Sequence, residues 1–186
     1  MKNVYLVGKA GSGKTVTAQF LRDQYKYRTA KFAFPVYQIG YNYFDMKDKD
    51  RALLQLVGTE AGRYGINNDL WVNRLLEDIQ IVNLVCDMKK IERPQFVLDD
   101  CRFPNEHKAL QAAGWVGINL SVTEENRIFR LKGRDGTAQE STLNHYSETA
   151  CDEFSHELFQ LDCNGTVAES MIELDDLARK ILFNVS

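Results

Sequence analysis

The sequence predicts an α/β protein with three layers: a doubly wound, mostly parallel five-stranded sheet between two layers of helices. Short apolar runs alternate with segments of helical periodicity along the chain, which is typical of parallel strands joined by crossover helices. Two polar motifs, GKAGSGKT and LDDCR, follow such apolar runs directly. Because doubly wound sheets bind ligands beyond the carboxyl ends of their strands, we expect both motifs at the functional site.

The strand and helix signals are separated by glycine, proline and capping residues. Expected in the first half are a strand at NVYLVG, a helix from Lys14 to about Tyr25, a strand near AKFAF that stops at Pro35, an aromatic helix at YQIGYNYF, a helix capped by Asp48 or Asp50 that ends around GTEAGRYG, and a longer helix that starts after Asn68 or Asp69 and ends before Pro94. Expected in the second half are a strand at QFVLDD, a helix from Pro104 through Ala112, a strand at WVGINLSV, a charged region at 124–148, a strand at ELFQLD and a C-terminal helix.

The composition suits one globular domain that acts on small molecules. The 186 residues carry a net charge of −3, with 44% apolar and 26% charged residues. Such a chain has no overall basic field for nucleic acid, and no stretch approaches the ~18 apolar residues that span a bilayer. We therefore expect a single domain over 1–186, a cytoplasmic location, small-molecule partners, no nucleic acid or membrane partner, and a monomer or homodimer.

The motif GKAGSGKT at 8–15 matches the phosphate-binding pattern G-x-x-x-x-G-K-[ST], the P-loop. In this pattern backbone N–H groups and a helix N-terminus surround a phosphate, the lysine contacts the β and γ phosphates, and the hydroxyl binds Mg²⁺. We therefore expect ATP as phosphoryl donor, a catalytic Lys14 and a Mg²⁺ ligand in Thr15. The expected ATP contacts are Gly8, Ala10, Gly11, Ser12, Gly13, Lys14, Thr15 and Val16.

A pair of carboxylates, Asp99 and Asp100, ends the third predicted strand. Residues two apart in an extended chain share a face, so Asp100 and Arg102 point to the same side. We expect Asp100 to hold Mg²⁺, directly or through water, and Arg102 to contact a phosphate. The alternative is that these carboxylates cap the following helix.

Three arginines in NRIFRLKGRDG have helical spacing and are candidates for a mobile lid over about 124–148. If the segment is a helix, Arg127, Arg130 and Arg134 share one face, and cations on a closing lid would neutralise a phosphoryl group in transfer. We favour Arg130 and Arg134 over Arg127 as catalytic residues. The alternative is a solvated charged face.

An acceptor-binding region is expected at about 35–75. Arg63 lies among glycines in GTEAGRYG, where a ligand can approach the backbone, and the Trp71 ring is suited to stack on a base. Phe34 belongs to a group of aromatic residues after the second strand. For the aromatic residues a core role is the alternative.

The ordered motifs GKAGSGKT, LLQLVGTEAGR with DLW, VLDDCRFPNE, HYSE and LDCNGT resemble bacteriophage-type deoxynucleoside monophosphate kinases of the P-loop nucleoside monophosphate kinase fold. The resemblance covers nearly the whole chain. It implies transfer of the γ-phosphoryl group of ATP to a deoxynucleoside monophosphate, giving ADP and the diphosphate.

The resemblance also implies individual residues. Arg63 matches the family's GTE-x-GR motif, and Asp100, Arg102 and Glu106 match D-x-RFPNE. Residues 145–148 match H-x-SE, but we assign no role in the reaction to His145, Ser147 or Glu148. We expect His145 on the substrate side, and a structural histidine is the alternative. The family often has a lysine shortly after the second-strand proline; here the sequence reads FAFPVYQ, and Lys31 takes its place among the expected substrate contacts.

Other classes of P-loop protein fit less well. A GTPase needs N-K-x-D and D-x-x-G, and neither string occurs in the sequence. The remaining alternatives are a P-loop kinase for another phosphorylated metabolite, such as phosphomevalonate, and a non-catalytic nucleotide-binding module. The acidic charge, the Asp100 and Arg102 pair and the candidate lid weigh against the module.

Overall fold

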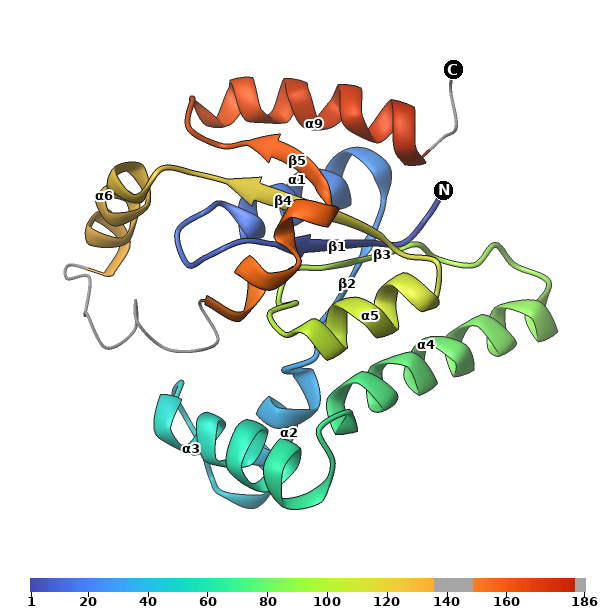
Figure 1. Cartoon of the computed structure of the whole chain (residues 1–186). Coiled ribbons are helices and arrows are strands. Elements are labelled where there is room, and N and C mark those ends of the chain that lie inside the picture. The colour runs from blue at the N-terminus through green and yellow to red at the C-terminus, as the bar shows by residue number, and fades with distance from the viewer. Residues whose placement is uncertain (136–148, 183–186) are drawn as a thin grey trace. The chain divides into compact units, whose positions relative to one another are not determined.

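The computed structural model describes residues 1–135 and 149–182, with side chains described for 1–133 and 149–180 (Figure 1). The elements are β1 Val4–Val7, α1 Lys14–Tyr25, β2 Arg28–Ala30, α2 Phe34–Tyr43, α3 Arg51–Gln55, the π-helix η1 Leu56–Ile66, α4 Leu70–Lys89, β3 Phe96–Leu98, α5 Pro104–Ala112, β4 Val116–Ser121, α6 Glu124–Asp135, the 3-10 helices η2 Ala150–Glu153 and η3 Ser155–Glu157, β5 Phe159–Asp162 and α9 Val167–Leu182.

The chain divides into two compact units. The sheet unit consists of Met1–Thr29 and Gln95–Ser186, and the helical unit is Ala30–Pro94. The expected acceptor region at 35–75 lies entirely in the helical unit. The expected lid at 124–148 belongs to the sheet unit in sequence, but 136–148 lie outside the described residues.

The five strands form one parallel sheet in the order β2-β3-β1-β4-β5, which confirms the predicted α/β class. The central strand β1 pairs with β3 on one side and β4 on the other, so that Val4 is in register with both Val97 and Val116. Since the strands are parallel, their carboxyl ends meet at one edge of the sheet. The loops that follow β1 and β3, which carry the two polar motifs, start at this edge.

Alternating side chains of β1 face the two helical layers of the sheet unit. Val4 and Leu6 are fully buried in a core that includes Leu21 of α1 and Leu174 of α9. Tyr5 faces the opposite side and contacts α5 through a hydrogen bond. The period-two alternation of β1 thus places α1 and α9 on one face and α5 on the other, as three predicted layers require.

Two elements of the first half differ from the sequence expectation. The strand expected near AKFAF ends earlier, at Ala30, and Phe34 and Pro35 open α2 instead. Proline is favoured in the first turn of a helix because its fixed φ suits that turn and it needs no N–H there. Pro35 therefore lies in the first turn of a helix, whereas the sequence predicted only that a strand ends there.

The segment GTEAGRYG is itself helical, and the helical stretch ends directly after it, at Ile66. Asp50 caps α3 as expected, and its side chain accepts a hydrogen bond from the Leu53 N–H at 3.0 Å. The chain then continues without a break into η1, an 11-residue π-helix that contains Arg63. Such wide helical turns are uncommon and occur frequently at functional sites.

The remaining boundaries agree closely with the sequence. The helices α1 and α5 span the expected 14–25 and 104–112, and α4 begins directly after Asp69. In the described parts of the chain, no helix combines the length and the apolar character that crossing a bilayer demands.

Candidate functional site: a phosphate-binding loop

The loop after β1 has the backbone of a phosphate cradle. Gly8, Gly11 and Gly13 all have positive φ, at 143°, 86° and 104°. A Cβ on Gly8 would lie 2.7 Å from the buried Ser12 hydroxyl oxygen and 3.0 Å from the Leu120 backbone oxygen. Only glycine fits this position without displacing the loop or β4.

The N-terminus of α1 is open to an anion. Gly13 is its N-cap, no side chain caps the helix, and its first turn contains no acidic residue. The N–H groups of the first turn and the helix dipole therefore favour a negatively charged ligand at this end. Thr15 and Val16, in the same turn, are exposed, as residues that contact a bound nucleotide or metal ion require.

Lys14 closes this loop with its own side chain. The ammonium group donates hydrogen bonds to the backbone oxygens of Gly8 and Lys9, the latter at 3.0 Å. The positive charge of Lys14, which we expect to contact the β and γ phosphates, thus lies over the loop between β1 and α1. Lys9 forms an ion pair of 2.8 Å with Asp152 of η2, which ties the same loop to the 150–153 turn.

Arg127 of α6 packs against the loop, a contact that the sequence did not indicate. A Cβ on Gly11 would lie 3.0 Å from the Arg127 backbone oxygen and 3.1 Å from its Cγ. The side chain is 4% exposed and pairs with Glu124, whose pKa is lowered mainly by this hydrogen bond. Its Nη1 is buried and has no hydrogen-bond partner among the described residues. A buried guanidinium N–H beside a phosphate loop is a donor available to an anionic ligand.

Arg130, which the sequence favours as catalytic, lies one turn further along α6. Its Nη2 donates to the Cys163 backbone oxygen at 2.6 Å and to that of Gly165 at 3.4 Å. These oxygens belong to the turn between β5 and α9, so Arg130 joins α6 to the motif LDCNGT. Arg134 is on the same helix, but its side chain is outside the described part of the chain.

The segment after β3 places Asp100 and Arg102 at the same sheet edge as the phosphate loop. Both side chains are partly buried. Glu106, in contrast, is 1% exposed, and its Oε2 accepts hydrogen bonds from the backbone N–H groups of Arg102 at 2.7 Å and Phe103 at 3.0 Å. Glu106 thus caps α5 and shapes the turn that carries Arg102.

Within the helical unit, the expected acceptor residues have different surroundings. Arg63 is partly buried on η1 and donates to the Asn68 backbone oxygen at 3.5 Å. Trp71 is 6% exposed, and its indole N–H donates to the Gly58 backbone oxygen at 2.7 Å. Phe34 is 61% exposed at the start of α2, and Lys31 is partly buried. A substrate role for these four residues stays a prediction.

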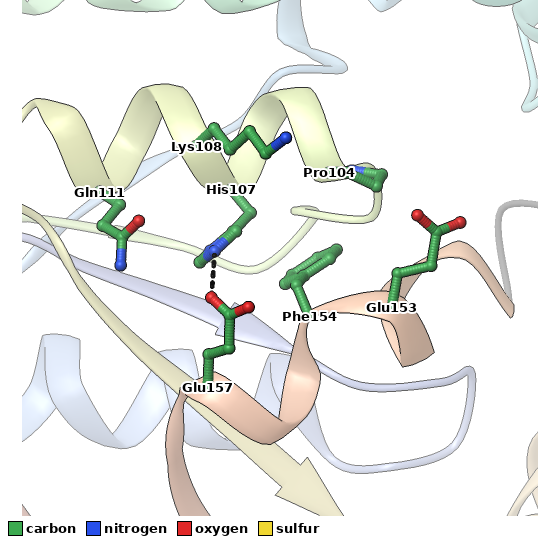
Figure 2. A pocket seen from close by; sticks show the side chains of 7 residues that line it. All are labelled: Pro104, His107, Lys108, Gln111, Glu153, Phe154 and Glu157. Atoms are coloured by element: carbon green, nitrogen blue, oxygen red, sulfur yellow. Dashed lines mark ion pairs between the residues drawn. The ribbon is translucent and has the colours of Figure 1, made fainter.

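A polar pocket of about 260 Å³ lies elsewhere in the sheet unit, between α5 and the η2–η3 segment (Figure 2). The His107 ring stacks on Phe154 with centroids 4.5 Å apart and shares a 2.8 Å hydrogen bond with the Tyr5 hydroxyl. His107 Nε2 faces Glu157 at 3.5 Å, and burial is the main cause of a strongly raised Tyr5 pKa. None of the seven lining residues belongs to the predicted site. Neither the spacing nor the residue types of the sequence indicated this network.

The structure thus brings together the loop at 8–15, the post-β3 segment and α6 in the sheet unit. The predicted ATP contacts form one continuous loop around the α1 N-terminus, with Asp100 and Arg102 at the same sheet edge. His145, Ser147 and Glu148 lie outside the described residues. Arg127, which the sequence places below Arg130 and Arg134, is buried against the loop, and its i,i+3 pair with Glu124 is a contact that the sequence spacing allows.

Comparison with known proteins supports the fold. No protein-family model matches the sequence, and no curated protein matches it. Among solved structures, TT1252 from Thermus thermophilus has a TM-score of 0.61 at 18% identity, over 97% of both chains. Shikimate kinase from Acinetobacter baumannii, in complex with shikimate, has a TM-score of 0.57 at 12% identity, over 99% of this chain and 94% of the other.

A gluconokinase from Sinorhizobium meliloti matches with a TM-score of 0.53 at 16% identity, over 100% of this chain and 98% of the other. The chain has the fold of the P-loop kinases. At these identities the likeness concerns the P-loop kinase fold alone, and the acceptor is a separate question.

Proposed function

We propose that this chain is an ATP-dependent kinase that transfers the γ-phosphoryl group to a deoxynucleoside or nucleoside monophosphate, giving ADP and the corresponding diphosphate. The observation that carries the proposal is the loop at 8–15, with its three positive-φ glycines, uncapped helix N-terminus and folded-over Lys14. A bound triphosphate is held by groups of these kinds: backbone N–H donors, a helix dipole and one mobile cation.

The proposed mechanism is positioning and electrostatic stabilisation. Lys14 swings from the loop oxygens to the β and γ phosphates, and Arg130 and Arg134 offset the negative charge that is shared between attacking and leaving oxygens. A phosphate oxygen of the acceptor is already ionised near neutral pH, so it attacks without a general base, and no covalent enzyme intermediate is needed.

Mg²⁺ belongs to this proposal through the donor set of the chain. Thr15 supplies an exposed hydroxyl in the first turn of α1, and Asp100 supplies a partly buried carboxylate. Oxygen donors of this kind, completed by phosphate oxygens and water, suit Mg²⁺. When bound, the ion neutralises phosphate charge during transfer.

A nucleotide acceptor is supported by the order of the motifs and by the chemistry of the helical unit. Arg63 is partly buried on a π-helix, where a bidentate guanidinium can hold a phosphate. Exposed aromatic side chains of the same unit can pack on a base. Their exposed fractions are 61% for Phe34, 48% for Tyr41, 79% for Tyr43 and 70% for Tyr64.

A second candidate is a kinase for a small non-nucleotide metabolite. Two structures of the same fold are named for shikimate and gluconate chemistry, so the fold by itself is compatible with such acceptors. A nucleotide-binding module without catalysis is the third reading.

An ADP-release assay with a panel of acceptors tests these proposals. The panel contains the deoxynucleoside and nucleoside monophosphates, shikimate, gluconate and phosphomevalonate, each with Mg²⁺ and ATP. We expect acceptor-dependent turnover with at least one monophosphate. Turnover only with a non-nucleotide acceptor would select the second candidate, and ATP binding without turnover on any acceptor would select the module.

Lys14→Ala is the matched negative control of this assay. The variant should lose turnover by orders of magnitude while its thermal unfolding is little changed. Lys180→Ala, which removes an exposed lysine of α9, should behave like the wild type. Near-normal turnover of Lys14→Ala would overturn the assignment of the donor site.

A further inference from the structure

The C-terminal half of α4 exposes an unusual number of large apolar side chains. We call this set the α4 stripe; its members are Ile81, Leu84, Val85, Met88 and Ile91, the last just after the helix. Their exposed fractions range from 44% for Val85 to 83% for Met88. In Figure 1 this half of α4 extends past α2 and α3, the neighbouring helices of the helical unit.

The stripe is a second apolar face and not the edge of the first. Trp71, Leu75 and Ile79 form the buried face of α4. At about 100° per residue, Ile81, Leu84, Val85 and Met88 fall in one arc on the opposite side. An amphipathic helix of a monomer has one apolar face, so a helix with two needs a second partner.

The size of the stripe fits a protein interface. Five side chains of this type, on average more than half exposed, present on the order of 600 Å² of apolar surface, which is at the upper end of what monomers expose. Two such faces together bury on the order of 1,200 Å², the lower limit of stable interfaces. The polar residues at the rim add to that area.

The charges at the two ends of the stripe select the partner. Glu77 and Asp78 are exposed one turn before it. At its other end Lys89 and Lys90 are exposed beside Glu92, and Asp87 is paired with Arg93 at 2.6 Å, so this end keeps a net positive charge. Asp78 is also bonded to Arg74 at 3.1 Å, so Glu77 contributes most of the acidic charge that a partner meets. The face therefore complements its own reversed copy, with an acidic end against a basic end.

We propose that the α4 stripe is a homodimer interface in which two α4 helices pack antiparallel about a two-fold axis near Leu84 and Val85. In this arrangement Glu77 of one copy lies near Lys89 and Lys90 of the other, twice by symmetry. A parallel arrangement would place like charges together at both ends. In an antiparallel dimer each copy covers the α4 stripe of the other. Neither stripe then remains exposed for a third copy, so the assembly stops at two.

Sedimentation velocity of the full chain, over about a hundred-fold range of concentration, measures the association. We expect a species of twice the 21.3 kDa chain mass. Leu84→Glu places a charge at the centre of the interface and should weaken the dimer at least about a hundred-fold. Asn73→Glu, an exposed change on the same helix outside the stripe, should remain dimeric.

A charge exchange tests the antiparallel arrangement and does not depend on the apolar variant. Glu77→Lys should weaken the dimer, Lys90→Glu should weaken it likewise, and the double variant should regain most of the wild-type association. A monomeric wild type at every concentration, a Leu84→Glu variant that stays dimeric with unchanged thermal unfolding, or a double variant weaker than both single variants would each overturn the proposal.

Discussion

A Cβ atom on Gly11 would lie 3.0 Å from the backbone oxygen of Arg127, 116 positions further along the chain. This close approach joins the tip of the phosphate loop to α6, the helix that carries the candidate lid arginines. A change in the loop is therefore expected to be transmitted to α6, and movement of α6 to change the shape of the loop.

Gly11→Ala should weaken ATP binding at least about tenfold, because the new methyl group meets Arg127 and the residue must keep a φ of 86°. Titration calorimetry with a non-hydrolysable ATP analogue measures the effect. Gly133→Ala is the matched control: apart from its chain neighbours and the backbone of α6, no described atom lies within 4 Å of its Cβ position, so ATP binding should be retained. Equal affinities for the two variants would contradict the coupling of loop and helix.

Arg130→Ala should lower kcat by about ten- to a hundred-fold, since it removes a cation and releases the turn that its side chain holds through Cys163. Steady-state kinetics with varied ATP separate kcat from KM. Lys132→Ala removes an exposed charge from the same helix and should change neither. If Arg130 only holds the turn, thermal stability will fall while kcat stays near the wild-type value.

Trp71→Phe should destabilise the protein by about 1–2 kcal/mol, because the partly buried Gly58 carbonyl loses the indole N–H donor at 2.7 Å. The ring also fills space at Gly62, where a Cβ would lie 2.6 Å from Trp71 Cζ2. Urea unfolding provides the measurement, and acceptor KM provides the second readout. A raised KM with unchanged stability would instead support the base-stacking role that the sequence suggested.

Glu106→Ala should cost about 2–3 kcal/mol of stability, since it leaves the N–H groups of Arg102 and Phe103 without their buried acceptor. Glu106→Gln keeps an acceptor oxygen and should retain most of the stability. A comparison of the two variants distinguishes a capping role of Glu106 from a role in substrate binding. If Glu106 also binds the acceptor, Glu106→Gln will lose turnover in the ADP-release assay despite normal unfolding.

The bond between Tyr25 of α1 and Asp175 of α9 predicts a pH dependence of stability. The Tyr25 hydrogen bond, followed by that of Arg179, lowers the Asp175 pKa, while burial and then Asp175 raise the Tyr25 pKa to about 12. A lowered carboxyl pKa contributes stability above its unfolded value, and this contribution is lost as the pH falls through the folded value. A raised phenol pKa contributes stability below about pH 10, which is lost as the pH rises toward 12.

Urea midpoints of the wild type and Tyr25→Phe should therefore differ by a constant amount between about pH 5 and 9 and converge below about pH 4. Tyr27→Phe is the matched control, because the Tyr27 hydroxyl donates to the Lys2 backbone oxygen at 2.7 Å and that oxygen does not titrate. The difference in urea midpoint between Tyr27→Phe and the wild type should persist in acid. If the Tyr25→Phe difference also persisted in acid, ionisation of Asp175 would contribute nothing to the pH dependence of stability.

Local patterns were sufficient for much of the fold and for the donor half of the site. The span of α1, the start of α5 at Pro104, the parallel strands and the loop at 8–15 all follow from residues within one or two turns of each other. Apolar periodicity, proline preference and glycine spacing act over such short distances. The same patterns placed the end of the second strand too late and did not show that the helix capped by Asp50 continues as a π-helix through GTEAGRYG. Local propensity alone decides neither feature.

Residues distant in sequence decided the rest. By itself the sequence determined the α/β class, the phosphate loop, and which charged residues were candidates for contact with phosphate. Only the tertiary structure decided that Arg127 is the arginine buried against the loop, that Glu106 caps a turn, and that Trp71 packs inside the helical unit. The physical reason is that burial and hydrogen-bond partners arise when segments far apart in sequence pack together, and residue spacing does not encode which of them meet.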